Sequence, residues 1–149
     1  MSCDMSYIRY IDRYILIFFN ERLNRVMIEE TIPEMDFRDS RVISNINEYF
    51  KGEDVDFSVY DVDLSELTDF ERDVLYETRR IPYGSVITYS DLAERVGRPK
   101  AVRAVGNTLR KNPLPILIPC HRVVGKNGLG GYSSGTIVKE KLLKLEGVL

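Results

Sequence analysis

The 149-residue sequence contains few residues that form disulfides or bind zinc: two cysteines, Cys3 and Cys120, and one histidine, His121. Two cysteines are too few for a disulfide framework, and in a reducing compartment both are expected to stay thiols. A structural zinc site built from four cysteine or histidine ligands is excluded unless carboxylates take part. We therefore predict no metal and no cofactor.

Long apolar segments are also absent. The richest apolar run, Ile15 to Phe19, is much too short to cross a bilayer, and the first residues lack a basic stretch followed by an apolar core. We therefore predict a cytoplasmic protein without a membrane partner. A hydrophobic content of 44% with 30% charged residues is ordinary for a globular protein and argues against disorder.

Acidic residues are missing from one long stretch, between Glu94 and Glu140, which carries nine Lys or Arg residues. Residues 1–63 hold 7 Lys/Arg against 14 Asp/Glu, a net charge of −7, whereas residues 64–149 hold 14 against 9, a net charge of +5. A run of one charge sign indicates a polyanionic partner. The alternative is an ordinary solvated basic surface.

The N-terminal half is predicted to be a small mixed unit. Short β-branched and aromatic runs predict antiparallel strands over Tyr7–Ile11, Tyr14–Phe19 and Arg25–Glu30. Apolar residues recur at helical spacing in Asp39–Phe50, which predicts a helix that packs on the sheet. Residues 53–65 alternate acidic and apolar side chains, as in a surface strand or a linker, and we place the domain boundary there.

The second predicted domain, residues 63–149 after a first domain of 1–62, carries clear helix signals. Two capping boxes are present, Thr68 with Glu71 and Thr88 with Asp91. Helices are predicted over residues 70–80, 90–96 and 99–110, with Pro99 in the first turn of the last one. A tight turn containing glycine joins the last two helices and predicts a helix-turn-helix.

The helix predicted over 99–110 has distinct faces. One face is apolar and is expected to enter the core: Val102, Val105 and Leu109. A second face is polar: Arg103, Asn107 and Arg110. Small residues keep the helix thin: Ala101, Ala104 and Gly106. A thin helix suits a narrow space such as the DNA minor groove, about 6 Å wide. The alternative is that the alanines pack against a neighbouring helix.

Cys120 is the candidate nucleophile. Residues 116–118 form an apolar, strand-like run that Pro119 ends, so Cys120 is expected where a buried element meets a loop. A free thiol has a pKa of about 8.5, and neighbouring His or Arg groups raise its thiolate fraction. The alternative is a buried, inert cysteine. Cys3 has no histidine or basic cluster near it in the sequence and is given no function.

His121 is the candidate base for this thiol. Adjacent side chains rarely face each other, so His121 is expected to reach the thiol through a water or a sharp turn. A carboxylate usually orients such a histidine, and Glu140 and Glu146 are the only acidic residues downstream.

Five ordered segments carry a family resemblance. The segment around the cysteine reads Pro115-Ile-Leu-Ile-Pro-Cys-His-Arg-Val-Val124. The others are Val86 to Ala93, Ala101 to Gly106, Asn112 to Pro115, and Gly131-Tyr-Ser133 followed by Lys139 to Gly147. In this order they resemble the motifs of the O6-alkylguanine-DNA alkyltransferases, also called methylated-DNA–protein-cysteine methyltransferases. The resemblance covers residues 69–147, while the N-terminal half matches only in length and coarse pattern.

The resemblance implies a reaction and roles for five residues. The reaction is DNA repair by irreversible, stoichiometric transfer of an alkyl group from O6 of guanine, and less readily from O4 of thymine, to Cys120. His121, Glu146 and a water would form the relay that makes the thiolate. Tyr89 would help to rotate the target nucleotide and would donate its proton toward guanine N3. Asn112 would brace the turn that carries the cysteine.

The resemblance also implies the DNA contacts and the substrate pocket. Arg103 would enter the base stack through the minor groove and occupy the space left by the flipped nucleotide. Further DNA contacts are expected from Tyr89, Lys100, Ala101, Ala104, Asn107 and Arg110. The pocket for the base and its alkyl group is expected from Pro115, Val123, Tyr132, Ser133 and Ser134.

The fold implied is α+β, with a ribonuclease-H-like N-terminal sheet and helix and a C-terminal helical domain of the winged helix-turn-helix type. We expect a monomer that binds double-stranded DNA containing O6-alkylguanine. Asn107 and Ser134 depart from the family pattern, because many relatives have glycine at these positions. Two other functions stay open: a lesion-binding helix-turn-helix module with a structural cysteine, and a Cys-His hydrolase of small esters.

Overall fold

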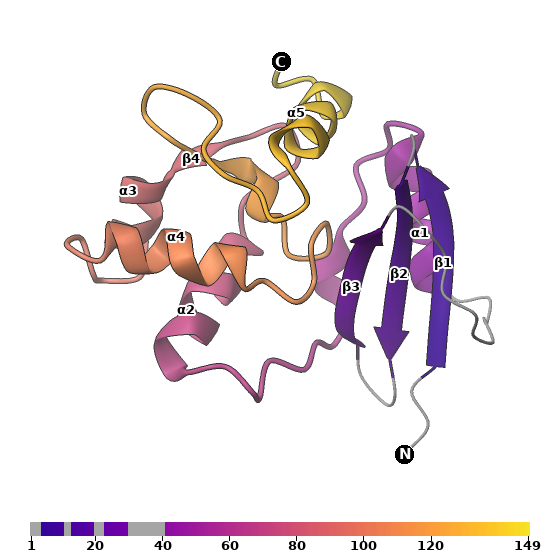
Figure 1. The fold of residues 1–149 in the computed structure, drawn as a ribbon, viewed down its shortest axis with the longest axis horizontal. Coiled ribbons are helices and arrows are strands. Elements are labelled where there is room, and N and C mark those ends of the chain that lie inside the picture. The colour runs from indigo at the N-terminus through magenta and orange to yellow at the C-terminus, as the bar shows by residue number, and fades with distance from the viewer. Residues whose placement is uncertain (1–3, 11–12, 20–22, 30–40) are drawn as a thin grey trace. The chain divides into compact units, whose positions relative to one another are not determined.

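The computed structural model describes residues 4–10, 13–19, 23–29 and 41–149. The chain forms two compact units, residues 1–63 and 64–149 (Figure 1). No helix in the described part of the chain is long and apolar enough to span a membrane.

The first unit contains a three-stranded antiparallel sheet. Its strands are β1 (Asp4–Tyr10), β2 (Arg13–Phe19) and β3 (Leu23–Glu29), hydrogen-bonded in the order β1-β2-β3. The predicted antiparallel strands are confirmed, although β1 begins earlier than expected. The predicted ends at Ile11 and Glu30 lie outside the described residues.

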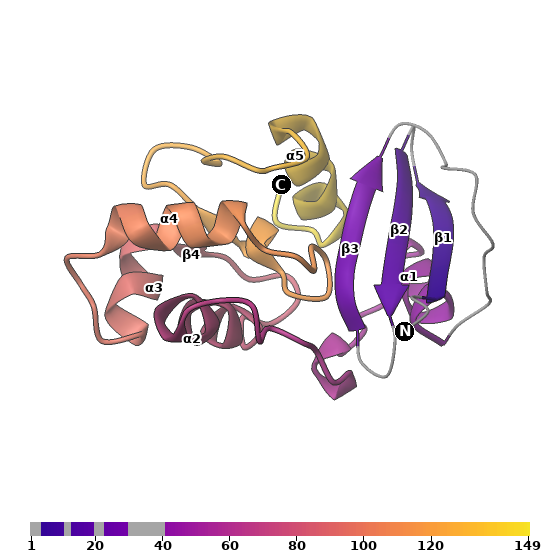
Figure 2. The same cartoon turned by 60° about the horizontal axis from the view of Figure 1, so that its bottom comes forward.

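One helix, α1 (Arg41–Phe50), lies along one face of this sheet (Figure 2). Its buried residues Val42, Ile46 and Tyr49 are spaced by four and three positions, so they share one side of the helix. The predicted helix is confirmed, except that its first two residues, 39 and 40, lie outside the described part. The ribonuclease-H-like assignment of this unit stays a prediction.

The segment after α1 is neither a simple surface strand nor a free linker. A short 3-10 helix, η1 (Phe57–Val59), buries Phe57, whose ring meets the Tyr49 ring edge-on with centroids 5.9 Å apart. Val62 is 2% exposed and forms a parallel bridge with Leu23 at the start of β3. The prediction of a surface element for residues 53–65 was therefore wrong for Phe57 and Val62, which are buried in the core of the unit, whereas Val59 is 63% exposed.

The second unit is mainly helical. Its elements, in chain order, are α2 (Asp69–Thr78), β4 (Ile87–Thr88), α3 (Tyr89–Arg95), α4 (Val102–Arg110), η2 (Cys120–Arg122), β5 (Val123–Val124) and α5 (Thr136–Leu145). Both predicted capping boxes are present: the Thr68 and Thr88 side chains accept hydrogen bonds from the backbone N–H groups of Glu71 and Asp91. The three predicted helices are confirmed within a few residues, and the winged helix-turn-helix description stays a prediction.

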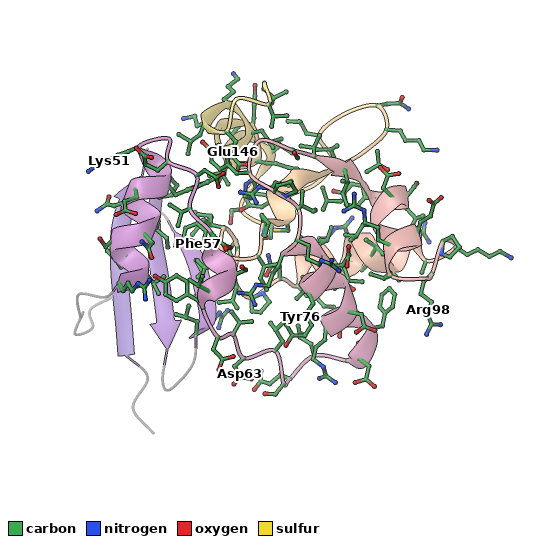
Figure 3. All side chains as sticks on the ribbon, turned by 180° about the vertical axis from the view of Figure 1, so that it is seen from behind. Lys51, Phe57, Asp63, Tyr76, Arg98 and Glu146 are labelled. Carbon is green, nitrogen blue, oxygen red and sulfur yellow. The ribbon has the colours of Figure 1, made fainter. Side chains whose placement is uncertain are left out.

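Helix α4 begins later than predicted. Pro99 lies in a tight turn in which the Ala101 N–H donates to the Arg98 carbonyl at 2.9 Å. Proline suits the second position of such a turn because its ring fixes φ near −65°. Figure 3 shows Arg98 at the outer end of this turn. Pro99 therefore belongs to the connection between α3 and α4, and the helix starts three residues after it.

A pair of two-residue strands positions the site. Ile87 and Thr88 of β4 pair in parallel with Val123 and Val124 of β5. Strand β4 leads directly into Tyr89, and β5 directly follows the turn that contains Cys120. The pairing of β4 with β5 therefore brings Tyr89 close to Cys120, although the two residues are 31 positions apart in the chain.

Candidate active site

A pocket with a volume of about 710 Å³ opens beside Cys120 in the second unit. Helix α4 forms one wall, and Tyr89 and the segment 131–133 form others. Its lining residues are Tyr89, Val102, Arg103, Gly106, Asn107, Leu109, Arg110, Cys120, Gly131, Tyr132 and Ser133. The predicted nucleophile, the polar face of α4 and part of the predicted substrate pocket thus border one cavity.

Cys120 begins the 3-10 turn η2 and is 5% exposed. Burial raises the pKa of its thiol, because a thiolate is poorly solvated there. The Asn112 side chain, which hydrogen-bonds the thiol, and the positive charge of Lys139 oppose this shift but do not cancel it. The resting residue is therefore a thiol, and a base is needed to produce the nucleophile at neutral pH.

Asn112 braces the segment that leads to the cysteine. Its Nδ2 donates to the Ile118 carbonyl at 2.9 Å, and its Oδ1 accepts from the Leu114 N–H at 3.0 Å. The segment is a compact buried turn and not the strand-like run predicted for residues 116–118. Ile116 has φ of 74°, a left-handed conformation that costs a non-glycine residue about 1–3 kcal/mol. The two hydrogen bonds that the Asn112 side chain makes, one as donor and one as acceptor, help to hold this strained turn.

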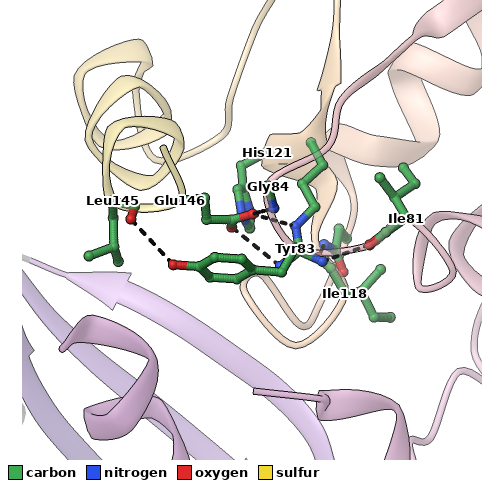
Figure 4. A network of polar contacts seen from close by, with 9 residues as sticks. Ile81, Tyr83, Gly84, Ile118, His121, Leu145 and Glu146 are labelled. Carbon is green, nitrogen blue, oxygen red and sulfur yellow. Dashed lines mark hydrogen bonds and ion pairs between the residues drawn. The ribbon is translucent and has the colours of Figure 1, made fainter. Parts of the chain in front are cut away.

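His121 and Glu146 form a buried pair. Nε2 of His121 lies 2.5 Å from Oε2 of Glu146, and both side chains are fully buried (Figure 4). Burial lowers the pKa of His121 more than the carboxylate raises it, so the imidazole is neutral. A neutral ring that faces a carboxylate carries its proton on Nε2, which leaves Nδ1 as the basic nitrogen. Of the two candidate acids, Glu146 is the partner, whereas Glu140 pairs with Lys144 at 3.1 Å.

Arg122 is a third member of this cluster and was missed as a functional residue from the sequence. Its Nε donates to Oε1 of Glu146 at 2.9 Å, and a second guanidinium nitrogen lies 3.3 Å from Oε2. A further nitrogen donates to the Ile81 carbonyl at 2.7 Å, and the Gly84 N–H donates to Oε1 at 3.0 Å. The carboxylate is thus held from several sides, with its charge balanced by the guanidinium.

Tyr89 is half-buried and begins α3 directly after the Thr88 cap. Burial raises the pKa of its phenol, and a nearby Cys120 thiolate would raise it further. The Gly131 backbone N–H donates to the phenol oxygen, a contact that lowers the pKa but does not outweigh burial. Tyr89 therefore keeps its proton at neutral pH and, as the acceptor in this bond, can still donate that proton.

Lys139 was also missed from the sequence. Its side chain is buried, and its Nζ donates to the carbonyls of Val123 at 2.7 Å and Gly131 at 3.1 Å. Nζ also lies 5.7 Å from the centre of the Tyr89 ring. Burial lowers the pKa of Lys139 to about 8. One sequence signal was present: Lys139 precedes Leu142 by three positions, so it lies on the apolar stripe of α5.

The polar face of α4 is open. Arg103, Ala104, Asn107 and Arg110 are exposed, and Ala101 is half-buried. A β-carbon on Gly106 would meet nothing within 4 Å. Ala104 therefore does not pack against a neighbouring helix, which was the alternative explanation for the small residues.

Other sequence-based assignments have mixed outcomes. Val102 is exposed at 36% and lines the pocket, so its placement in the core was wrong, while Val105 and Leu109 are buried as predicted. Three predicted pocket residues do not line the pocket: Pro115 and Val123 are buried, and Ser134 is half-buried. The predicted DNA contact Lys100 is exposed in the turn before α4. The Tyr132 hydroxyl is buried and has no hydrogen-bond partner within the described part of the chain.

Residues 69–148 match the protein family described as 6-O-methylguanine DNA methyltransferase, DNA binding domain. A methylated-DNA–protein-cysteine methyltransferase from Metallosphaera sedula is 47% identical over 108 residues, which are 72% of this chain and 67% of that protein. The family match contains Cys120, His121, Arg122 and Glu146.

The structure is similar to solved structures from Mycobacterium tuberculosis. The crystal structure of its O6-methylguanine methyltransferase superposes with a TM-score of 0.83 at 32% identity, covering 97% of this chain and 93% of that one. A crystal structure of the M. tuberculosis OGT in complex with DNA gives a TM-score of 0.80 at 31% identity, covering 96% and 92% of the two chains. The likeness therefore extends over nearly the whole chain.

Proposed function

The chain belongs to the methylated-DNA–protein-cysteine methyltransferase family, and from this premise we propose that it repairs DNA by transferring an alkyl group from guanine O6 to Cys120. Transfer from O4 of thymine is a slower second reaction. The observation that carries the proposal is the position of Cys120, which borders the pocket while its neighbour His121 contacts buried Glu146. No cofactor enters the reaction, because the thiol itself is the acceptor.

The first step of the proposed reaction is proton removal from the thiol. A water passes the Cys120 proton to Nδ1 of His121, and Glu146 stabilises the resulting imidazolium through its contact with Nε2. The sulfur then forms a bond with the alkyl carbon while the bond from that carbon to O6 breaks. The product thioether is not hydrolysed, so each molecule reacts once.

Tyr89 is the proposed acid in the second half of the reaction. The electron pair released from the broken bond would leave guanine as an anion, and a proton delivered to N3 prevents this. Two observations support Tyr89 as the donor: burial raises its pKa, so the proton is retained, and its ring borders the pocket with Cys120. The buried Tyr132 hydroxyl at the same pocket is suited to bind the base by a hydrogen bond.

We assign DNA binding to the exposed face of α4, with the protein acting as a monomer. Arg103 enters the minor groove and fills the space that the flipped nucleotide leaves. Asn107, Arg110 and Lys100 contact the sugar-phosphate backbone of the DNA. Ala101 and Ala104 let the helix approach closely. Support comes from the exposure of this face, from its position at the rim of the Cys120 pocket, and from the DNA complex of the M. tuberculosis OGT.

The proposal is tested by intact-mass measurement after incubation with a duplex that contains O6-methylguanine. We expect the protein to gain one methyl group, in an amount that never exceeds one per molecule, and Cys120→Ala to gain none. Cys120→Ala keeps Cys3, so it also tests whether the other thiol accepts the group. Tight binding without a mass increase would instead support the lesion-binding module, and release of more than one product per protein would support a hydrolase.

The pH dependence of transfer tests the role of His121. Burial lowers the pKa of His121 below 6.5 and raises that of Cys120 above 9.0, so between pH 7 and 9 the resting pair stays imidazole and thiol. Transfer at saturating DNA should therefore change by less than about threefold in this range, in which Lys139, with a pKa of about 8, loses its charge. In His121→Asn the thiolate forms only by spontaneous ionisation of Cys120. The transfer rate of this variant should therefore be lower than that of the wild type and should rise about tenfold per pH unit. The same steep rise in the wild type would show that His121 does not take the proton.

A further inference from the structure

Gly130 lies directly against Tyr89. Its φ is 74°, and a β-carbon placed on it would lie 2.5 Å from the Tyr89 hydroxyl oxygen, 2.7 Å from Cε2 and 3.0 Å from Cζ. These separations are well below normal van der Waals contact, which begins near about 3.5 Å between carbon atoms. The phenol therefore occupies the space that a side chain at position 130 would take.

The residue next to Gly130 holds the same phenol by a hydrogen bond. The Gly131 N–H donates to the Tyr89 oxygen, and the Gly131 carbonyl accepts from Nζ of Lys139 at 3.1 Å. Lys139 in turn is buried and donates to the Val123 carbonyl at 2.7 Å, next to the Cys120 turn. The backbone at 130–131 is exposed on its outer side, but on its inner side the hydrogen bond to buried Lys139 ties it in place beside Tyr89.

We propose that Gly130 is a positioning residue for Tyr89: it leaves the space in which the phenol lies at the pocket, and any side chain there would displace the hydroxyl. The proposal rests on the assigned role of Tyr89 as proton donor. The displaced group would be the tyrosine, because an aromatic side chain can rotate, whereas the backbone of Gly131 is tied to Lys139. A small change at position 130 should therefore impair the chemical step without unfolding the protein.

Gly130→Ala is the direct test, and the chain supplies a matched control. Gly97 has the same φ of 74°, but a β-carbon there would meet nothing within 4 Å. Gly97→Ala therefore carries the same backbone strain without touching Tyr89. We expect Gly130→Ala to reduce single-turnover methyl transfer at saturating duplex by about 10-fold to 100-fold, part of the roughly 10²–10⁴-fold that a well-placed general acid contributes. Gly97→Ala should transfer at the wild-type rate within about twofold.

A double variant separates positioning from a general structural effect. Tyr89→Phe alone removes the proton donor and should slow transfer. If Gly130→Ala already displaces the phenol, then adding Tyr89→Phe to it should cause little further loss, and DNA affinity should be the same in Gly130→Ala, Tyr89→Phe and the double variant. Gly130→Asn serves as a second variant, because asparagine tolerates the left-handed conformation but still brings a β-carbon. It should show the same loss of rate.

Two results would overturn the inference. One is transfer by Gly130→Ala and Gly130→Asn as fast as by Gly97→Ala, while Tyr89→Phe is slow. The other is a full additional loss when Tyr89→Phe is combined with Gly130→Ala, because the two changes would then act independently. Both results leave the proposed function intact, since that fails only if the wild-type protein gains no methyl group on Cys120.

Discussion

Glu146→Gln is expected to destabilise the protein by about 3–5 kcal/mol and to slow methyl transfer. The carboxylate receives hydrogen bonds from Arg122 and Gly84 and contacts Nε2 of His121 at 2.5 Å. Glutamine has one acceptor oxygen, and its amide would bring N–H groups toward these donors. It also leaves the buried Arg122 guanidinium without a counter-charge, and breaking a buried ion pair from one side costs about 3–5 kcal/mol. Urea unfolding at pH 7 measures the loss.

Glu140→Gln is the matched control for this prediction. Glu140 lies on α5, which ends just before Glu146, and the same chemical change there removes only a partly exposed pair with Lys144 at 3.1 Å. Such pairs contribute less than about 1 kcal/mol. Equal stabilities of the two variants would contradict a central role of the Glu146 cluster in the second unit. The effect on the transfer rate can be separated from the loss of stability. A Glu146 variant that still folds should bind DNA with unchanged affinity but transfer the methyl group more slowly.

Local sequence signals predicted much of the second unit because they act over a few residues. Thr68 with Glu71 and Thr88 with Asp91 form their capping boxes as expected, since each needs only a hydroxyl and a carboxylate three positions apart. Pro119 was expected to end a strand-like run before Cys120, and Cys120 does begin a new element, η2, although the residues before it form a turn. The partner of His121 was narrowed to two acids from the residues alone, and Glu146 came from the family resemblance.

The remaining features depend on tertiary contacts that spacing does not show. Arg122 was read as part of a basic run, yet it is buried against Glu146, which is 24 positions away. Pro99 fits both a first helical turn and a tight turn, and only the Ala101 to Arg98 hydrogen bond distinguishes them. The contact of Gly130 with Tyr89 requires a loop and a helix to meet. Gly130 is one of several glycines in residues 125–131, and nothing in the sequence distinguishes it as the one that contacts a tyrosine.

Arg103→Ala is expected to slow repair of duplex DNA by about 100-fold while leaving the reaction with free O6-methylguanine base within about twofold of the wild type. Extrusion of a base from a duplex costs a few kcal/mol, and a side chain that fills the vacated space offsets part of this cost. A loss of about 2.7 kcal/mol of transition-state stabilisation lowers the rate about 100-fold. Free base needs no extrusion, and Arg103 lies at the rim of the pocket on the exposed face of α4, outside the Cys120, His121 and Glu146 cluster.

Arg98→Ala is the control for the charge that this change removes. Arg98 is exposed in the turn before α4 and does not line the pocket, so its loss should weaken DNA binding without changing the ratio of the duplex rate to the free-base rate. Single-stranded DNA containing O6-methylguanine adds a second comparison. The target base there has no paired strand to leave, so the Arg103→Ala defect should shrink. Equal losses on free base, single strand and duplex would show that Arg103 supports the pocket itself and does not replace the flipped nucleotide.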